Sequence, residues 1–573
     1  MKQPFFILIL VLFGFSQSYC SDKSDDLNEQ AAGATDYFVT SISQLNTVSG
    51  SVKPGDVVTL KDGTWKDADV LFVGNGTESD PVTYKAETVG GVVFSGTSKM
   101  RIAGNHLVVD GFSFENGHPS GGSVIEFRNG SLHAQHSRLT NVSIKDYSPS
   151  DKNIDTKWVS LYGYKNRVDH CSFEGKTNSG TTLVVWMNAS PDYHLIDNNY
   201  FGPRPDLGFN GGETIRIGTS DWSLYSSYTT VEHNLFEECD GEIEIISNKS
   251  CHNVYRYNTF LNNNGTLTLR HGDDCEVYNN FFIDKAGKSG SGGVRVIGRR
   301  HKVYNNYFEG LNGNGFRAAV SVTNGMPDSP LNGYYQVEDA LIGFNTIVNC
   351  RQAFAIGSGV SSSLTLPPVN VLVANNLVKT RSNTTMVYMH DASADILWDG
   401  NLVDGASGLA AQEGIQMLSF NFSSDGQILR PEASALISNL ATSAMPEVNL
   451  DIDLQDRPSG SRHVGCDQID DAPVANRPKR REDVGVRYEG ATSIAQNHSP
   501  EEVFFFRSNP LSLSVNFNQM EQRALTLFSL EGHLLEHKEG RGTGYNFYAA
   551  RKPGVYLLRV IKSNLVNTYK VAL

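Results

Sequence analysis

Two short stretches, Val277-Tyr-Asn-Asn-Phe-Phe282 and Val303-Tyr-Asn-Asn-Tyr-Phe308, decide the fold of this chain. Each begins with an apolar residue, continues with polar residues that include asparagine, and closes on apolar residues. After a long first gap, related units recur along the chain at steps of roughly 22 to 39 residues, a period typical of solenoid proteins. The last residues of the units are Phe114, Phe173, Phe201, Phe236, Phe260, Phe282, Phe308, Ile347, Val378 and Val403.

The spacing of the units separates the solenoid classes. Helical and leucine-rich repeats need a helix in every unit, and the only helical pattern is a short one near Ser41–Val48. A propeller blade needs about 40 to 45 residues. The sequence therefore predicts an all-β fold, a right-handed parallel β-helix, in which longer steps are coils with insertions. We expect the recurring asparagines to stack at one corner and to share amide hydrogen bonds.

The N-terminal sequence predicts export. Met1-Lys2 precedes an apolar run from Phe5 to Phe15 and small or polar residues to Cys20, the order of a secretory signal peptide. Lipid attachment at Cys20 is the alternative, and we expect a secreted or cell-surface protein. No other apolar run approaches the roughly 20 residues of a membrane-spanning helix, so we predict no transmembrane segment.

The composition of the chain changes twice after the repeats. Prolines and polar residues replace the repeats, and alternating strand patterns then indicate a small C-terminal β-sandwich. Ser508-Asn-Pro510, Leu525-Thr-Leu-Phe-Ser-Leu-Glu-Gly532 and Gly554-Val-Tyr-Leu-Leu558 resemble the sorting domain of type IX secretion, which implies that secretion machinery as a partner. A carbohydrate-binding or stabilising module is the alternative. The predicted domains are a signal peptide (1–20), a polar leader (21–35), the β-helix (36–425), a trailing segment and linker (426–498) and the sandwich (499–573).

Charge and cysteine content exclude several function classes. A net charge of −14 and a pI near 5.5 argue against a nucleic-acid partner. An anionic ligand would need local positive charge. The seven cysteines have no zinc spacing and are expected to be mostly buried, although one or two disulfides stay open. Candidate cations are Arg216, Lys249, Arg270, Arg295, Arg299 and Arg300.

Strand alternation predicts where the charged side chains point. In Glu242-Ile-Glu-Ile245 both isoleucines should face the core and both glutamates the solvent. In Leu267-Thr-Leu-Arg270 and Val294-Arg-Val296 the same rule turns Arg270 and Arg295 outward. Steps of about 26 and 25 residues separate the second glutamate, Arg270 and Arg295, so we expect them on adjacent coils, roughly 4.8 Å apart.

This charged face is either a surface ion-pair ladder or a ligand site. Ion pairs on a surface contribute little stability. Asn210-Gly-Gly-Glu-Thr-Ile-Arg-Ile-Gly218 adds oxygen donors and a cation one coil earlier, and Lys249 ends the strand of the glutamates. Two carboxylates and an amide oxygen suit a hard cation such as calcium. We therefore favour a ligand site.

Three motifs carry a family resemblance. Asn210 to Gly218, Glu242-Ile-Glu244 with Ser247-Asn-Lys-Ser250, and Leu269-Arg-His-Gly272 resemble polysaccharide lyase family six, the chondroitinase-B-like and alginate lyases. The resemblance covers roughly residues 36–488 and implies a parallel β-helix. It also implies residue roles, which are calcium binding by Asn210, Glu242 and Glu244, Brønsted base for Lys249, Brønsted acid for Arg270, and sugar contacts for His271 and Arg295. Arg216 and Arg299 are expected to bind the same anionic chain because they add local positive charge.

The implied chemistry is β-elimination from a uronic acid. Removal of the C5 proton places negative charge on the neighbouring carboxylate, which calcium would stabilise. Lys249 must be neutral to take that proton. The role of Arg270 as acid follows only from the resemblance, because an arginine rarely loses its proton and its chemistry alone indicates charge stabilisation. The product is a 4,5-unsaturated uronate end.

The sequence leaves several substrates and functions open. Asn210-Gly-Gly-Glu213 and Gly298-Arg-Arg-His-Lys-Val-Tyr-Asn-Asn-Tyr-Phe308 look more like the alginate-cleaving members, so we predict an alginate lyase. The first alternative is a dermatan sulfate lyase of the chondroitinase B type. A non-catalytic glycan-binding β-helix and a glycoside hydrolase on the same fold are the others.

Overall fold

The computed structural model describes residues 33–410, 413–432, 438–469, 473–487, 503–509, 512–529, 534–547, 555–562 and 565–572. The chain divides into two compact units, Met1–Glu489 and Gly490–Leu573. The predicted signal peptide, Cys20 and most of the polar leader lie outside the described residues. Within the described ranges, none of the helices combines the length and the apolar character that a membrane crossing requires.

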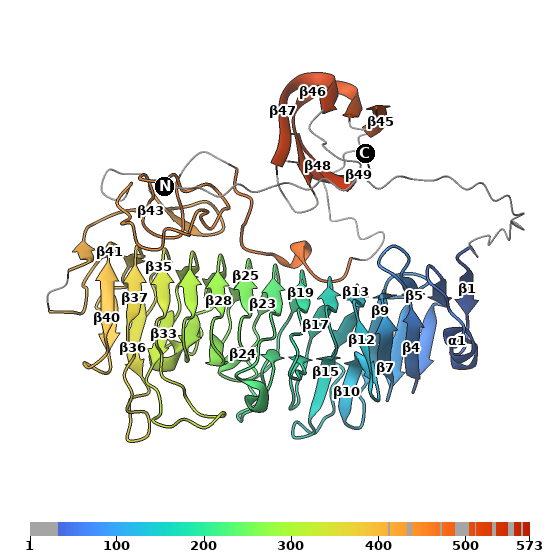
Figure 1. Ribbon diagram of the computed structural model, residues 1–573, viewed down its shortest axis with the longest axis horizontal. Helices are drawn as coiled ribbons and strands as arrows, with labels where there is room; N and C mark the ends of the chain where they lie inside the picture. The colour runs from blue at the N-terminus through green and yellow to red at the C-terminus, as the bar shows by residue number, and fades with distance from the viewer. Residues whose placement is uncertain are drawn as a thin grey trace, which may run out of the picture. The chain divides into compact units, whose positions relative to one another are not determined.

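The first unit is a parallel β-helix, as predicted. Three sheets of 14 strands each run through it, and strands from successive coils are neighbours in every sheet (Figure 1). One sheet extends from β1 (Asp36–Val39) to β40 (Ile396–Asp399) and another from β3 (Gly63–Lys66) to β42 (Ile415–Met417). The third sheet carries the predicted site. Its ordered run comprises β7 (Lys99–Asn105), β10 (Gly122–Glu126), β15 (Thr156–Leu161), β18 (Leu183–Val185), β21 (Ile215–Ile217), β24 (Glu244–Lys249), β27 (Thr266–His271), β30 (Val294–Val296), β33 (Val320–Thr323), β36 (Phe354–Ser358) and β39 (Val387–Met389).

A short helix covers the first coil. Helix α1 (Ile42–Ser49) begins after Ser41, whose hydroxyl accepts a hydrogen bond from the Gln44 N–H at 3.3 Å. Such a cap satisfies one of the free donors of the first turn. Leu45 is fully buried against the end of the core. The helix predicted near Ser41–Val48 is therefore confirmed.

Phenylalanines fill the core coil by coil. The closing phenylalanine of each unit stacks on its equivalent in the next coil, with ring centroids 4.5 to 5.4 Å apart. Stacked aromatic pairs add stability beyond the area that they bury. The stack consists of Phe173, Phe201, Phe236, Phe260, Phe282 and Phe308.

The predicted asparagine ladder is present inside one corner. Each buried amide donates to the amide oxygen of the next coil, for example from Asn280 to Asn306 at 3.0 Å and from Asn306 to Asn345 at 3.1 Å. Buried polar groups need such partners. The rungs are Asn199, Asn234, Asn258, Asn280, Asn306, Asn345, Asn376 and Asn401.

Where a second asparagine precedes a rung, as at Asn279 and Asn305, it has a different task. Asn279 and Asn305 adopt positive φ angles of 54° and 52°, which asparagine tolerates better than most residues. Their side chains therefore point away from the ladder. Asn279 donates to the Asp451 carbonyl at 2.8 Å, and Asn305 donates to the Leu450 carbonyl at 2.6 Å. These asparagines thus attach the trailing segment to the coils.

The trailing segment runs back along the β-helix after its last coil (Figure 1). The Thr442 N–H donates to Asn375 at 2.8 Å, the Lys479 N–H to the Thr259 hydroxyl at 2.7 Å, and the Val486 N–H to the Ser172 hydroxyl at 3.1 Å. We call residues 442–487 the strap. From Asn476 onward, the strap contacts coils in the reverse of their chain order.

The cysteines are buried and reduced among the described residues. Their thiols lie inside the coils and have no disulfide partner there. The prediction that they act as small buried apolar residues is confirmed for this set, and Cys20 lies outside it. The six are Cys171, Cys239, Cys251, Cys275, Cys350 and Cys466.

The second unit is antiparallel. Strands β45 (Val503–Asn509), β46 (Ser512–Ser529), β48 (Val555–Lys562) and β49 (Leu565–Ala572) form one sheet in that order, and β47 (Leu534–Phe547) also pairs with β46. Val515, Leu525 and Leu558 belong to its separate apolar cluster. The described strands hydrogen-bond as a single five-stranded sheet, which agrees with the antiparallel character expected of the sandwich.

Candidate functional site

The predicted site residues gather on the outer face of one sheet. Strands β21, β24, β27 and β30 are consecutive neighbours there, so four successive coils contribute side chains. Loops at both ends of these strands add the rest. Arg216 lies on β21, Lys249 on β24, Arg270 and His271 on β27 and Arg295 on β30, whereas Asn210 and Glu242 precede β21 and β24, and Arg299 follows β30.

Alternation holds on β27 and β30, but the exposure of Arg295 differs from expectation. Leu267 and Leu269 are fully buried in the core, and Arg270 lies on the outer face of β27 and is partly exposed. Arg295 also leaves the core, yet only 2% of its surface is exposed. Phe316 covers its guanidinium at 4.0 Å from the ring centroid. The predicted exposure of Arg295 is therefore wrong because an insertion covers the strand.

The alternation predicted for residues 242–245 is also wrong in part. Strand β24 starts at Glu244, so Glu242 and Ile243 belong to the preceding loop, and Ile243 is only half-buried. Ile245 and Ile246 are both buried, because a register shift between Glu244 and Ile246 interrupts the alternation. A bulge of this kind redirects a side chain, here Glu244, toward the cleft.

Glu244, Arg270 and Arg295 approach one another as expected on adjacent coils. They are not register partners, and their long side chains bring the charged groups together. The mid-strand row pairs Arg216 with Ser247, Ser247 with Thr268, and Thr268 with Arg295. Glu244 pairs with Thr266, four residues before Arg270. Its Oε1 nevertheless lies 3.8 Å from Arg270 Nε and 3.8 Å from Arg295 Nη1.

Arg270 is held by a loop that sequence analysis missed. Its Nη1 donates to the Gly333 carbonyl at 2.6 Å and contacts His271 Nε2 at 2.8 Å, and its Nη2 donates to the Asn332 carbonyl at 3.1 Å. The Tyr334 ring lies 4.2 Å from the guanidinium carbon. Both Nη1 hydrogens are thereby used, so one Nη2 hydrogen and the Nε hydrogen remain for a ligand.

The same loop fixes Arg295. The Tyr334 hydroxyl accepts a hydrogen bond from Arg295 Nη2 at 2.6 Å. The loop lies in the step from Phe308 to Ile347, which is the longest after the first gap between the repeat units and so predicts an insertion. Its length could be found from the sequence, but its contacts with arginines 39 and 63 residues earlier could not.

His271 is neutral at the pH of most cells. Burial, followed by the charges of Arg270 and Lys249, lowers the pKa of the imidazole to about 3. Arginine only donates hydrogen bonds, so Nε2 of His271 accepts from Arg270 and the ring proton resides on Nδ1. His271 therefore helps to orient Arg270 and carries no charge of its own.

Replacing His271 with glutamine should remove part of the acid sensitivity of the fold. The folded pKa lies below the unfolded value of about 6.5, so the unfolded chain binds the proton first and the free energy of unfolding falls as the pH drops through this window. Between pH 7 and pH 5 the loss should be about 2 kcal/mol smaller in His271→Gln than in wild type. Urea unfolding at both pH values measures it, and equal losses in the two proteins would contradict the assignment.

Three glutamates form the acidic part of the site. Burial, then Glu213 and Glu244, raise the pKa of Glu242 to about 8. Glu242 Oε1 and Glu213 Oε2 are buried and have no hydrogen-bond partner among the described residues. Glu244 Oε2 accepts from the Ser247 hydroxyl at 2.5 Å. The unpartnered oxygens of Glu242 and Glu213 lack a positive partner in the described part of the chain, whereas Glu244 faces Arg270 and Arg295.

Glycines let the two acidic loops touch. A Cβ on Gly212 would collide with the Gly241 carbonyl, and a Cβ on Gly241 would collide with the Gly212 carbonyl. The Gly211 N–H donates to Glu242 Oε2 at 3.2 Å, which ties the loop of Asn210 to that of Glu242. Arg204 lies beneath and donates to the Glu213 carbonyl at 2.8 Å.

This donor set fits a hard cation. Calcium binds through carboxylate and amide oxygens. The site offers buried carboxylate oxygens without partners among the described residues, one carboxyl group with a raised pKa, and the amide of Asn210 in the adjoining loop. Glu213 joins the three predicted ligands as a fourth oxygen donor. Its place in Asn210-Gly-Gly-Glu213 marks it in the sequence, although the predicted ligand set did not include it.

The predicted base and two further cations differ in their surroundings. Lys249 is half-buried, pairs in register with His271, and has no ion pair among the described side chains. Arg216 likewise has no carboxylate partner there, and its guanidinium carbon lies 5.3 Å from the Trp186 ring centroid. Arg299 instead pairs with Asp273 at 3.1 Å. Lys249 and Arg216 are therefore free to meet a ligand.

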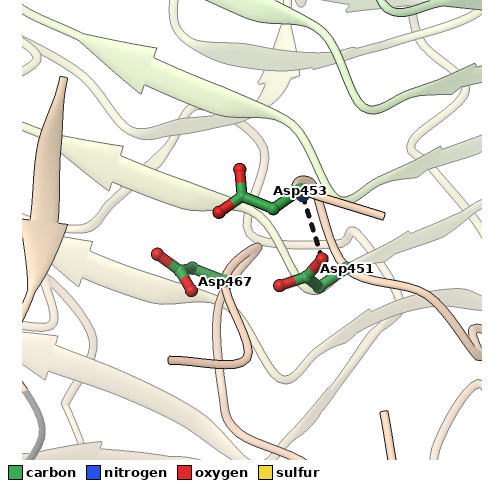
Figure 2. A group of neighbouring side chains, drawn as sticks. All are labelled: Asp451, Asp453 and Asp467. Atoms are coloured by element: carbon green, nitrogen blue, oxygen red, sulfur yellow. Dashed lines mark hydrogen bonds between the residues drawn. The ribbon is translucent and has the colours of Figure 1, made fainter. Parts of the chain in front are cut away.

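A second acidic group lies away from these strands, in the strap. Oxygens of Asp451, Asp453 and Asp467 lie within 4.8 Å of one another, and Figure 2 shows the bond from the Asp453 N–H to Asp451. Arg430 donates to Asp453 at 2.6 Å and to Asp467 at 2.8 Å. The Arg430 guanidinium offsets part of this charge and links Asp453 with Asp467.

The arrangement can move a proton beside a stabilised anion. The half-buried amine of Lys249 lies on the outer face of the sheet, on coils that also carry Arg270, Arg295 and an oxygen-rich cation cradle. An acidic polymer lying on this face would meet positive charge at its carboxylates, and an amine within reach of its ring hydrogens. Both features are what an elimination next to a carboxylate needs.

Comparison with known proteins adds independent findings. The family model of Chondroitinase B matches residues 39–441, whereas no curated protein matches the chain. Among solved structures, the PL6 family alginate lyase AlyGC is 41% identical with a TM-score of 0.67, over 70% of this chain and 55% of that one. This chain thus matches little more than half the length of AlyGC.

Two further structures match over most of their own length. A mannuronic acid specific polysaccharide family 6 lyase from human gut microbiota is 32% identical with a TM-score of 0.62, over 68% of this chain and 92% of that one. The PL6 family polysaccharide lyase Pedsa3628 from Pseudopedobacter saltans is 28% identical with a TM-score of 0.58, over 67% and 97%. All three structures therefore share the fold of this chain over about two thirds of its length.

Proposed function

Since the chain belongs to polysaccharide lyase family 6, we propose that it cleaves alginate by β-elimination and leaves 4,5-unsaturated uronate ends. The observation that carries the proposal is Lys249, an outward amine without an acidic partner among the described residues, beside Arg270 and the oxygen cradle. Such an amine can serve as a base next to groups that stabilise negative charge.

The proposed reaction uses the chain's own residues in two linked steps. Neutral Lys249 takes the C5 proton of the uronate, and the electron pair of that C–H bond becomes the C4–C5 double bond. The C4–O bond breaks at the same time or afterwards, and its electron pair stays on the leaving oxygen. Arg270 directs its remaining Nη2 hydrogen or its Nε hydrogen at that oxygen, which takes up one proton overall.

Substrate orientation is the task of the other cations. Arg295 is locked between Phe316 and Tyr334 and is 2% exposed, so it supplies a fixed charge from beneath the surface of the site. Fixed charges stabilise a transition state better than mobile ones because they need no reorganisation. Neutral His271 holds Arg270 in place from the other side. We retain Arg216 and Arg299 as proposed contacts of the polymer.

Calcium is the proposed cofactor. Asn210, Glu242 and Glu244 would hold the ion through side-chain oxygens, together with Glu213. Glu242 Oε1 and Glu213 Oε2 are the oxygens without a hydrogen-bond partner among the described residues. When bound, the ion supplies positive charge opposite the substrate carboxylate and stabilises the enolate-like charge that forms there. The charge of the bound ion would also offset the mutual repulsion among the glutamates.

Alginate is favoured over dermatan sulfate as the substrate. AlyGC is an alginate lyase by its printed name, and the gut relative is mannuronic acid specific. The segment Asn210-Gly-Gly-Glu213 agrees with the alginate-cleaving members of the family. Dermatan sulfate stays the alternative because the matching family model is that of Chondroitinase B.

Ultraviolet absorbance tests the proposal directly. The conjugated double bond of the product absorbs, so the purified protein should raise the absorbance of alginate and leave dermatan sulfate unchanged. A rise with dermatan sulfate alone would support the alternative substrate. Binding of alginate with no rise would show a non-catalytic glycan-binding protein, and chain cutting without absorbance would show a hydrolase.

Removal of calcium should abolish most of the activity. A chelator is expected to lower kcat by about a hundredfold or more, because several kcal/mol of charge stabilisation are lost. Added calcium should restore the rate, and Glu242→Gln should need more calcium for half-maximal rate. Unchanged activity in the chelator would remove the proposed role of Glu242 and Glu244.

We further infer that the protein is exported. The support is the signal-like N-terminus and the sorting-domain motifs in the second unit, with type IX secretion as the proposed route. An extracellular or surface location would place the enzyme beside a polymer too large to enter a cell. Fractionation of the producing bacterium tests the location.

A further inference from the structure

A row of stacked cationic and aromatic side chains lies on the solvent side of the site-carrying sheet. The Arg128 guanidinium carbon lies 4.0 Å from the Tyr162 ring centroid. The rings of Tyr162 and Trp186 are stacked, 5.9 Å apart with 14° between their planes. Arg216 closes the row over Trp186 at 5.3 Å. We call these four residues the upstream row.

The upstream row is aligned with the proposed base. Register pairs connect the inward residues Leu161, Val185, Ile217 and Asn248 across β15, β18, β21 and β24. The residue after each of them points outward. Those next residues are Tyr162, Trp186, Gly218 and Lys249.

Gly218 leaves an opening between the row and the base. It has a φ of 82°, and a Cβ there would lie 2.7 Å from the Lys249 carbonyl. No side chain therefore separates Trp186 from Lys249 along the line. Because one coil advances roughly 4.8 Å, Trp186 and Tyr162 lie about two and three coils, or roughly 10 and 14 Å, from the base.

A loop covers the site on the C-terminal side of Lys249. Asn332, Gly333 and Tyr334 cover Arg270, and Phe316 covers Arg295 on the next coil. A polymer seated at Lys249 meets this loop in the C-terminal direction. The open direction along the sheet is therefore toward the upstream row.

The charge of the row suits a polyanion. Arg216 has no carboxylate partner among the described residues, and Arg128 contacts Glu126 only at 3.6 Å while 37% of its side chain is exposed. A guanidinium binds a carboxylate through charge-assisted hydrogen bonds. The two rings between the arginines stack on one another, so they turn their outward edges toward a ligand. These edges offer apolar surface, against which the C–H groups of a pyranose can be buried.

We propose that the upstream row is a binding platform for the uronate units that lie beyond the reacting pair. The outward edges of Tyr162 and Trp186 pack against the sugar rings, and Arg128 and Arg216 pair with the carboxylates. This assignment rests on the proposed function for the nature of the polymer. It makes the protein prefer long chains over short oligomers.

A purely structural stack predicts something different. Trp186 is anchored by a hydrogen bond from its Nε1 to the Ser160 hydroxyl at 3.1 Å, so the ring has a fixed orientation whether or not a sugar is present. If the row only joined coils, its loss would lower stability and change the kinetics of long and short substrates equally. Dependence on chain length therefore separates the two roles.

The test compares ring-removing variants on polymer and on short oligomers. Tyr162→Leu and Trp186→Leu should each raise KM for polymeric alginate about fivefold to tenfold, with kcat and the KM for a trisaccharide unchanged. Tyr193→Leu is the matched control, because Tyr193 is 43% exposed and stacks on Tyr228 at a different corner. Equal effects on polymer and trisaccharide would overturn the platform.

Two additions keep the test independent of turnover and of folding. In the Lys249→Ala background, alginate affinity should fall about fivefold to tenfold on adding Trp186→Leu, and an unchanged affinity would overturn the platform even if the proposed function fails in the absorbance assay. Arg128→Gln changes an exposed side chain and should weaken binding about threefold at low salt and hardly at high salt. An effect that is equal at both salt concentrations would contradict the role of its charge.

Discussion

Replacing Lys249 with alanine is expected to lower kcat on alginate by about 10²- to 10⁴-fold, the range that a lost general base produces. The amine is half-buried, lies in register with His271, and has no ion pair among the described side chains, so little stability depends on it. Initial rates from the ultraviolet absorbance of the new double bond measure the loss. The affinity for polymer should change far less than kcat.

Lys249→Arg is the matched control for this result. Arginine is positively charged throughout the neutral range and cannot accept a proton, so this variant removes the base and leaves a cation in its place. We expect this variant to be as inactive as Lys249→Ala while binding alginate like wild type. Wild-type activity in Lys249→Arg would show that Lys249 contributes charge alone.

Arg270→Lys should lower kcat by about 10²- to 10³-fold, the effect of removing one preorganised donor at a developing oxyanion. A lysine has one ammonium group and cannot reproduce the planar set of contacts that Arg270 makes with Gly333, Asn332 and His271. The leaving oxygen then loses a donor whose position is fixed. Single-turnover rates on alginate oligomers measure the step.

Arg256→Lys provides the comparison for that variant. Arg256 has similar partners, with Glu232 at 2.6 Å and the Tyr257 ring at 5.2 Å, but lies on β25 (Val254–Arg256) in another sheet. Its replacement should affect thermal stability modestly and kcat hardly at all. If Arg270→Lys retained kcat, the proposed donor would have to be sought elsewhere in the cleft.

The repeat units contain enough information to predict the β-helix because the physics that they report is local. The apolar positions of Phe282 and Phe308 and the polar positions between them recur in every coil, so one register satisfies them all. The double asparagines were harder to interpret. Asn306 continues the ladder, whereas Asn305 binds the strap. Only the positive φ of Asn305 separates their roles.

The site was less predictable where the chain departs from the repeat. Alternation assigned Arg270 correctly, but the register shift beside Glu244 broke the rule that placed Glu242 and Ile243. A bulge is a property of two paired strands, so one strand's sequence does not reveal it. The covering of Arg295 by Phe316 and Tyr334 depends on how an insertion folds, which periodicity cannot indicate.

The strap changes how this solenoid must come apart. A repeat fold in which each coil contacts only its neighbours can lose coils one at a time from either end. Here the backbone at Lys479 bonds to Thr259, and that at Val486 bonds to Ser172, coils that do not contact each other. Fraying at the C-terminal end therefore releases a segment that also holds the middle of the stack. Distant coils are coupled in this way, and unfolding of the β-helix becomes more cooperative than a one-dimensional array allows.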